Sequence, residues 1–269
     1  MARWKSLKDT LLLAVTTWRL WLLHFVANAV FFLLFIWWLR PHEASGWQLF
    51  YSSLVILLTA AATLVLHAGT LDFFQIAHQR KESNMPAAFR RAWRHLPAIA
   101  VWALVFFFLQ MLLGKLDQYS VTLPGFLRSE FPAWLRRMIS EPRLDSMYSG
   151  LLWLLHWLIL PALLLPLALF SADRGFRGLI AVRDCWRTLR SLVYWIVLLV
   201  AALIGVSATQ AIMGWKLDPR TATLSAEETS LVFRLLFAYL LRIFSWLLAC
   251  SALGRNTADT AGESAAQPV

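Results

Sequence analysis

The chain has 269 residues, of which 59% are hydrophobic and 15% are charged. A soluble domain is about one-half apolar and one-quarter charged, so both values exclude an ordinary soluble domain and indicate a protein embedded in lipid. Two cysteines, Cys185 and Cys250, exclude a disulfide framework, and the meaning of the +10 net charge depends on where the basic residues lie.

Six apolar stretches are each close to the 20 residues that a helix needs to span a bilayer. In chain order they are residues 20–39, 49–70, 97–114, 151–170, 192–214 and 231–253. The first is too long for a signal peptide and ends at two tryptophans without a small-residue cleavage site, so we expect it to be an uncleaved span. The sequence therefore predicts an all-α polytopic membrane protein, with a six-helix transmembrane bundle over residues 1–253. The small, polar residues 254–269 predict a disordered cytoplasmic tail.

Lys and Arg concentrate on one side of the predicted membrane. With the N-terminus inside, fifteen of the 25 fall on the cytoplasmic side, eight on the external side and two within the sixth helix. Such an excess marks the cytoplasmic side of short loops, so we predict an inner (plasma) membrane protein with both termini in the cytoplasm. The partner expected for the basic loops is then a layer of anionic lipid headgroups and not nucleic acid.

A Trp-Arg pair recurs where the first, third and fifth predicted spans begin. Each pair follows an amphipathic lead-in, and the pairs are Trp18-Arg19, Trp93-Arg94 and Trp186-Arg187. Tryptophan settles at the headgroup level, and arginine reaches lipid phosphates, so these six residues are candidates for interfacial lipid contact. The recurrence predicts three pseudo-repeated helical hairpins, although each interface could also select Trp and Arg independently.

Paired spans separated by a cytoplasmic amphipathic segment, with a Trp-Arg pair before the next helix, resemble a broad group of uncharacterised bacterial multi-pass proteins. The membrane domain attached to some glycerophosphodiester phosphodiesterases has a similar repeat. This resemblance covers most of residues 10–253 and implies an association with the membrane and its lipids. The chain has no room for the phosphodiesterase catalytic domain, so the resemblance does not imply that activity.

The sixth predicted span carries a stripe of small or polar residues. Arg234, Ala238, Arg242, Ser245 and Ala249 share one helix face. An arginine inside a membrane is costly unless it is paired or hydrated, so we expect this stripe to face protein or water. Arg242 and Arg234 are then candidates either for an anion or headgroup site or for an internal ion pair.

Polar residues in the first two spans are the other candidates. His24 and Asn28 lie four residues apart on one face of the first span, and His67 lies at a similar depth in the second. Two histidines without a third ligand do not make a metal or haem site, so no cofactor and no metal are predicted. Asp72, at the cytoplasmic end of the second span, is the acidic group expected to pair with a buried arginine such as Arg242.

Sequence motifs for common enzyme chemistry are missing. The chain has no P-loop, no GxSxG nucleophile motif and no HExxH zinc motif. The sequence therefore favours a non-enzymatic multi-pass membrane protein that organises or interacts with lipids or a partner complex, which could be another membrane protein or a second copy. The alternative is a small transporter or permease component with a polar path lined by helices 1, 2 and 6.

Overall fold

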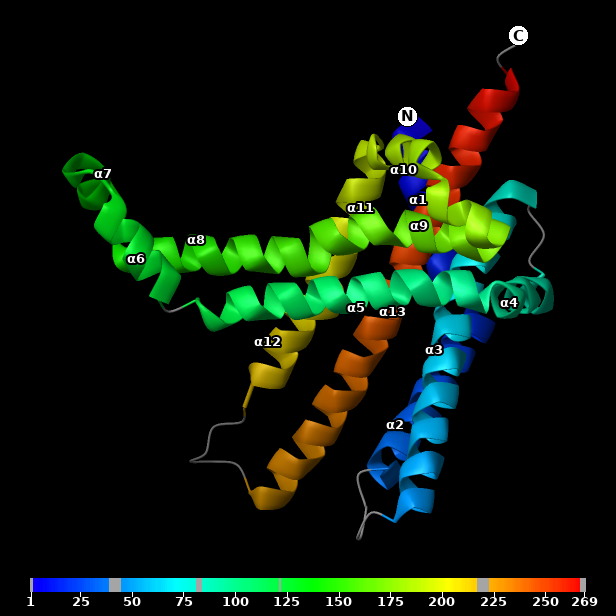
Figure 1. Ribbon diagram of the computed structural model, residues 1–269, viewed down its shortest axis with the longest axis horizontal. Coiled ribbons are helices and arrows are strands. Elements are labelled where there is room, and N and C mark those ends of the chain that lie inside the picture. The colour runs from blue at the N-terminus through cyan, green and yellow to red at the C-terminus, as the bar shows by residue number, and fades with distance from the viewer. Residues whose placement is uncertain (1, 39–44, 81–83, 121, 217–222, 267–269) are drawn as a thin grey trace.

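A computed structural model of the protein describes residues 2–38, 45–80, 84–120, 122–216 and 223–266, and every regular element in these ranges is helical (Figure 1). The elements are α1 (Ala2–Thr16), α2 (Trp18–Trp38), α3 (Gly46–Arg80), α4 (Met85–Arg94), α5 (Leu96–Gln118), α6 (Thr122–Glu130), α7 (Ala133–Met138), α8 (Glu141–Leu154), η1 (Leu155–Ile159), α9 (Leu160–Arg174), η2 (Gly175–Ile180), α10 (Val182–Leu189), α11 (Leu192–Ala202), η3 (Leu203–Ala208), α12 (Thr209–Gly214) and α13 (Leu224–Ala266).

Six helical stretches in these ranges are long and apolar enough to cross a membrane, so the protein is an all-α multi-pass membrane protein. They are Trp18–Trp38, Gly46–Gln79, Leu96–Gln118, Glu141–Ile180, Leu192–Gly214 and Leu224–Ala258. Each contains one of the six predicted spans, apart from Leu39, which lies outside the described residues. The number and order of the spans are therefore confirmed.

The six spans form three helical hairpins (Figure 1). In the first, α2 lies beside α3; in the second, α5 lies beside α8 and α9; in the third, α11 and α12 lie beside α13. The second hairpin runs at a steep angle to the other two and carries α6 and α7 at its far end. A helical lead-in, α1, α4 or α10, precedes each hairpin, as the sequence predicts.

Local sequence explains where the lead-in α4 begins and which face it buries. The side chain of Asn84 accepts a hydrogen bond from the backbone N–H of Ala87 at 3.1 Å, and Pro86 occupies the first turn, where no backbone donor is needed. Ala88 and Ala92, four residues apart, are fully buried. Two small residues on one face let the helix lie close against α3 while its charged face stays outside.

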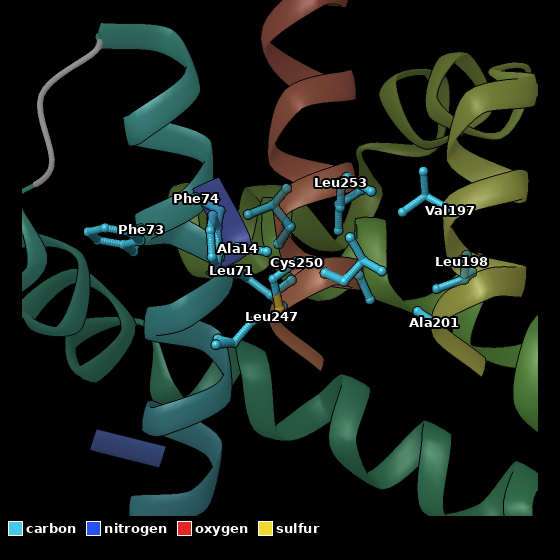
Figure 2. Close-up of a cluster of buried hydrophobic side chains, with 14 of the residues drawn as sticks. Ala14, Leu71, Phe73, Phe74, Val197, Leu198, Ala201, Leu247, Cys250 and Leu253 are labelled. Carbon is cyan, nitrogen blue, oxygen red and sulfur yellow. The ribbon is translucent and has the colours of Figure 1, made fainter. Parts of the chain in front are cut away.

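The buried core lies at one end of the three hairpins and not along their length. We call this region the hub: α1, residues 66–80 of α3, α4, α9, α10 and residues 243–257 of α13. Figure 2 shows its centre, where Phe74, Leu247 and Leu253 pack among neighbouring apolar side chains. In α3, residues 66–76 are buried or nearly so, whereas most of residues 46–60 are exposed. The hub therefore holds the hairpins together at the end where both termini lie.

Two glycines permit close contacts between spans. A Cβ atom on Gly254 would lie 2.6 Å from the backbone carbon of Phe74, so α13 crosses α3 almost in backbone contact. A Cβ on Gly205 would lie 2.4 Å from Oγ of Ser245, and that hydroxyl donates to the carbonyl of Ala201 at 2.6 Å. Small residues at Ala201 and Gly205 thus allow the close approach that their four-residue spacing predicts.

The structure differs from the sequence prediction at the C-terminal tail. Residues from Gly254 onward were expected to be disordered, but α13 continues to Ala266. Thr257 is 4% exposed, and the side chain of Asn256 donates to the carbonyl of Thr188 in α10 at 3.0 Å. At residues 254–257, the small and polar side chains that predict disorder serve close packing against the hub.

The fourth span shows how proline is accommodated in the membrane region. Pro166 lies inside α9 and cannot donate to the carbonyl of Ala162, one turn earlier. The hydroxyl of the buried Tyr194, from α11, donates to that carbonyl at 3.1 Å. Pro161 is the second residue after the π-helical turn η1. The carbonyl that Pro166 leaves without its helical donor is therefore satisfied by a neighbouring span.

Candidate functional site

Three exposed tryptophans mark the bends at which the lead-ins meet the spans. The side chains of Trp18, Trp93 and Trp186 are 63%, 61% and 57% exposed. A guanidinium lies over two of these rings, Arg19 at 5.7 Å from the centroid of Trp18 and Arg190 at 5.5 Å from that of Trp186. Large aromatic rings that remain this exposed beside cations at the end of a span suit the headgroup layer of a bilayer.

The three bends are alike but not identical. Trp18 is the first residue after its bend, whereas Trp93 and Trp186 belong to α4 and α10 before theirs. At the first and third bends an indole N–H reaches back to a lead-in carbonyl, from Trp21 to Ala14 at 2.9 Å and from Trp195 to Leu189 at 2.7 Å. These bonds satisfy carbonyls that the break in the helix would leave without a partner.

At the middle bend, the polar contact reaches the other arm of the same hairpin. Nδ1 of His95, between α4 and α5, lies 2.7 Å from the carbonyl of Ala172 in α9. Gly175, which follows α9 with a φ of 61°, lies beneath the same imidazole, because a Cβ there would be 3.1 Å from the ring. A side chain at this position would therefore be strained and would also crowd His95.

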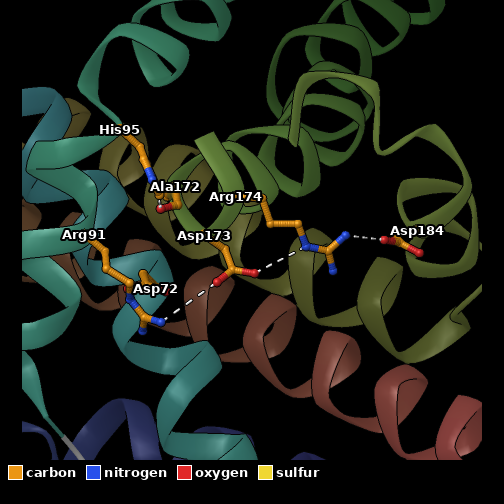
Figure 3. A network of polar contacts seen from close by, with 7 residues as sticks. All are labelled: Asp72, Arg91, His95, Ala172, Asp173, Arg174 and Asp184. Carbon is orange, nitrogen blue, oxygen red and sulfur yellow. Dashed lines mark hydrogen bonds and ion pairs between the residues drawn. The ribbon is translucent and has the colours of Figure 1, made fainter. Parts of the chain in front are cut away.

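A chain of ion pairs connects the second and third lead-ins through the end of α9 (Figure 3). Arg91 of α4 bonds Asp72 at 3.0 Å and lies 3.9 Å from Asp173, and Asp173 lies 3.4 Å from Arg174. Arg174 then bonds Asp184 of α10 at 2.7 Å. Positive and negative groups alternate along the chain, so each charge has an opposite neighbour and α4, α9 and α10 are held at a fixed spacing.

A groove with a basic wall lies between α4 and the end of α3. Its volume is about 290 Å³, and it is lined by Ile76, Asn84, Ala87, Arg90, Arg91 and Arg94. Among the residues that the structure describes, no acidic side chain lines it. A smaller cavity of about 180 Å³ adjoins it across Ile76 and Arg91 and contains Asp72 and Asp173. The carboxylates thus gather behind Arg91, and the groove itself presents the exposed Arg90 and Arg94.

The expected pairing of Asp72 with Arg242 is wrong. Asp72 is 1% exposed and bonds Arg91, a residue of the second lead-in. Arg242 is exposed, and within the described ranges it has no ion pair. At 3.6 residues per turn it lies about 80° around the helix from Arg234, at the edge of the polar stripe. Within the stripe, Ala238 and Ala249 are buried and face protein, whereas Arg242 does not.

Arg234 is the buried arginine of the sixth span. It is 6% exposed, pairs with Glu227 one to two turns earlier and donates to the carbonyl of Trp215 at the end of α12. An apolar pocket of about 820 Å³ between α12 and α13 has Arg234 on its wall. Of the two interpretations left open by the sequence, these contacts favour the internal ion pair for Arg234.

The histidines of the first two spans meet as expected. The ring centroids of His24 and His67 are 5.6 Å apart, and Trp246 of α13 lies 4.8 Å from His67. The Thr70 hydroxyl donates to Leu66 at 2.7 Å, so Nε2 of His24 must donate to Thr70 at 2.9 Å. His67 donates from Nδ1 to the carbonyl of Thr63 at 2.8 Å. Hydrogen bonds and ring packing thus account for both histidines as links between helices.

Asn28 lies one turn beyond His24 and is half-buried next to Tyr239 of α13. The Tyr239 hydroxyl donates to the carbonyl of Phe25 at 2.7 Å. At Cys185 in α10, burial raises the pKa of the thiol to about 11, so it stays protonated near neutral pH. Both observations agree with roles in packing.

Sequence reasoning missed most of the ion-pair chain. Asp173 and Arg174 lie just after the predicted fourth span, much as Asp72 lies just after the second. This position at the end of an apolar span is the signal that could have identified them. Comparisons of the chain with protein-family models, with curated sequences and with solved structures gave no match. The site therefore has to be interpreted from its own geometry.

Proposed function

We propose that this chain is a non-enzymatic multi-pass protein of the inner (plasma) membrane that interacts with anionic lipids at the cytoplasmic leaflet. The observation that carries the proposal is the set of three exposed tryptophans beside arginines, one at each bend between lead-in and span. In this arrangement the hub and both termini are cytoplasmic, and Trp18, Trp93 and Trp186 lie at the headgroup level.

The exposed apolar side chains along the hairpins support the same proposal. In the most apolar windows of the first three spans, only 6–11% of the residues are buried inside the protein. Such surfaces need an apolar environment, and we propose that lipid tails provide it. A second copy or another membrane protein on these faces would be detected in the experiment below as a larger mass.

The experiment is native mass spectrometry of the full chain released from nanodiscs that hold equal amounts of phosphatidylglycerol and phosphatidylcholine. We expect phosphatidylglycerol to be retained preferentially, and Trp93→Ala or Trp186→Ala each to reduce its retention to a similar extent. Trp134→Ala is the matched control, since Trp134 is 63% exposed but lies on α7, at the far end of the second hairpin. Equal retention of the two lipids by the unaltered chain would overturn the proposal.

The transporter alternative makes a different prediction. A polar path along the first, second and sixth spans (α2, α3 and α13) requires water beside Thr59, Thr63 and Ser245. In the structure, His67 instead packs between His24 and Trp246. Single cysteines at these three positions should react slowly with a water-soluble maleimide if the lipid-interaction proposal holds. Rapid labelling at all three would favour transport.

A further inference from the structure

The groove beside α4 follows one face of that helix from its first turn to its last. The α4 residues that line it are Asn84, Ala87, Arg90, Arg91 and Arg94. At 3.6 residues per turn, these positions fall within an arc of about 120°. The fully buried Ala88 and Ala92 lie next to one edge of the arc, and the exposed Trp93 lies beyond the other edge. The groove is therefore a strip between the face that packs on the hub and the tryptophan at the bend.

Two of the three arginines in the groove keep their charge available for a ligand. Arg91 bonds Asp72 at 3.0 Å and lies 3.9 Å from Asp173, and Figure 3 shows it directed toward these carboxylates. Arg90 and Arg94 are exposed, and in the described part of the chain neither has an ion pair. The carboxylates therefore offset the charge of Arg91 and leave Arg90 and Arg94 as the net positive charge of the groove.

The chemistry of the groove suits a phosphate group. Arg90 and Arg94 lie four residues apart, where like charges destabilise a helix and an anion between them removes the repulsion. Guanidinium groups match the oxygens of a phosphate, and the apolar Ile76 on the other wall suits the glycerol of a lipid. A volume of about 290 Å³ lies at the lower limit of ordinary ligand pockets, so the groove admits a headgroup and leaves the acyl chains outside.

The third lead-in does not repeat these features. The residues of α10 that lie 93 positions after 90–94 are Arg183-Asp184-Cys185-Trp186-Arg187. Asp184 takes the place of Arg91, and Arg187, in the place of Arg94, already has a partner within the protein. The arrangement is therefore specific to α4, and α10 supplies a natural control.

We infer that the groove beside α4 binds the phosphate of one anionic phospholipid between Arg90 and Arg94. The inference rests on the proposed function, since it places α4 at the cytoplasmic headgroup layer. The ligand chemistry is a phosphate group, so free inorganic phosphate is the other source that the experiment distinguishes.

The test titrates the full chain in neutral detergent with short-chain phosphatidylglycerol and measures bound lipid by native mass spectrometry. We expect one tight site in the unaltered chain. R90Q and R94Q should each weaken it about fivefold, and R90Q/R94Q about 30-fold, because an arginine beside an anionic group contributes roughly fivefold. Ala87→Leu keeps every charge but fills part of the groove, and overfilling should weaken the site by about fivefold or more.

The matched control is R183Q, which removes the exposed arginine at the equivalent position of α10 and should leave the tight site intact. R136Q/R137Q, on α7, controls for the loss of two exposed charges. The thermal unfolding midpoint of each variant is measured alongside, and the single R90Q, on the exposed face, keeps the test open if Ala87→Leu does not fold. Equal weakening by either control, or unchanged binding by folded R90Q/R94Q or Ala87→Leu, would overturn the inference.

A parallel titration with inorganic phosphate identifies the source of the phosphate group. Displacement of the lipid by an equal concentration of inorganic phosphate would assign the groove to free phosphate and overturn the lipid assignment. If the unaltered chain retains phosphatidylglycerol preferentially but the groove variants bind it as tightly, the groove site fails while the proposed function stands. If the unaltered chain shows no preference, both fail.

Discussion

At the scale of single residues, the pair formed by Asp72 and Arg91 contributes to stability. Asp72 is nearly inaccessible, and Arg91 is about one-third exposed. Burying a carboxylate is expensive, and the guanidinium at 3.0 Å offsets much of that cost. The arginine also connects Asp72 to Asp173, so its loss would leave two neighbouring carboxylates without their shared cation.

We therefore expect Arg91→Gln to destabilise the protein by roughly 3 kcal/mol, the usual effect of removing one partner of a buried pair. The measurement is the midpoint of thermal unfolding in detergent. Arg90→Gln, one residue earlier and fully on the exposed face, should leave the midpoint nearly unchanged. Exchange of the two charges in Asp72→Arg with Arg91→Asp should recover part of the lost stability. If Asp72→Arg were instead rescued by Arg242→Asp, the result would show that Asp72 pairs with the sixth span.

The partner of Asp72 shows what sequence can and cannot predict about the site. The need for a partner follows from a carboxylate at the end of an apolar span, and the sequence predicts it. The identity of the partner depends on how a lead-in helix folds back on α3, which no local pattern encodes. The same holds for His24 and His67, whose similar depth is predictable but whose hydrogen bonds to Thr70 and Thr63 are not.

At the scale of helices, hydropathy finds the spans but not the ends of the helices. The sequence predicts all six spans, because an apolar run of about 20 residues has few other uses. α3 has 35 residues and α13 has 43, so at 1.5 Å per residue both exceed the roughly 30 Å of a bilayer core. Residues 71–80 of α3 and 254–258 of α13 are polar enough to resemble loops, but they remain helical within or beside the hub.

The crossing of α3 and α13 at Gly254 is a tight contact between two spans. We expect Gly254→Ala to lower stability by about 1–3 kcal/mol through overpacking, since the obstructing atoms are the backbone of Phe74 and Gln75. Most of this range exceeds the roughly 1 kcal/mol of stability that alanine adds through its helix propensity. The change is measured as the thermal unfolding midpoint in detergent.

Gly150→Ala in α8 is the control, because nothing lies within 4 Å of a Cβ at that position. It should leave the midpoint unchanged or raise it. A midpoint for Gly254→Ala that is equal to or above that of the unaltered protein would contradict the tight crossing.

At the scale of the whole molecule, the three hairpins meet at the hub and diverge from it (Figure 1). If the hub is cytoplasmic, α7 and the start of α8 are external. In a background with Cys185→Ala and Cys250→Ala, a cysteine at Ser140 should react with a membrane-impermeant maleimide added to intact cells. A cysteine at Phe176, which is 63% exposed on the hub side, should react only after the membrane is opened. The reverse pattern would invert the topology.

The hub also joins the two ends of the chain. The hydroxyl of Ser251 donates to the carbonyl of Thr10 at 2.9 Å, across a separation of 241 residues. At roughly 5–20 residues per second, a ribosome takes on the order of 10–50 s to make the polypeptide between them. Throughout that interval, α1 has been synthesised but lacks its contact with α13. The contact between α1 and α13 can therefore form only after α13 has been synthesised.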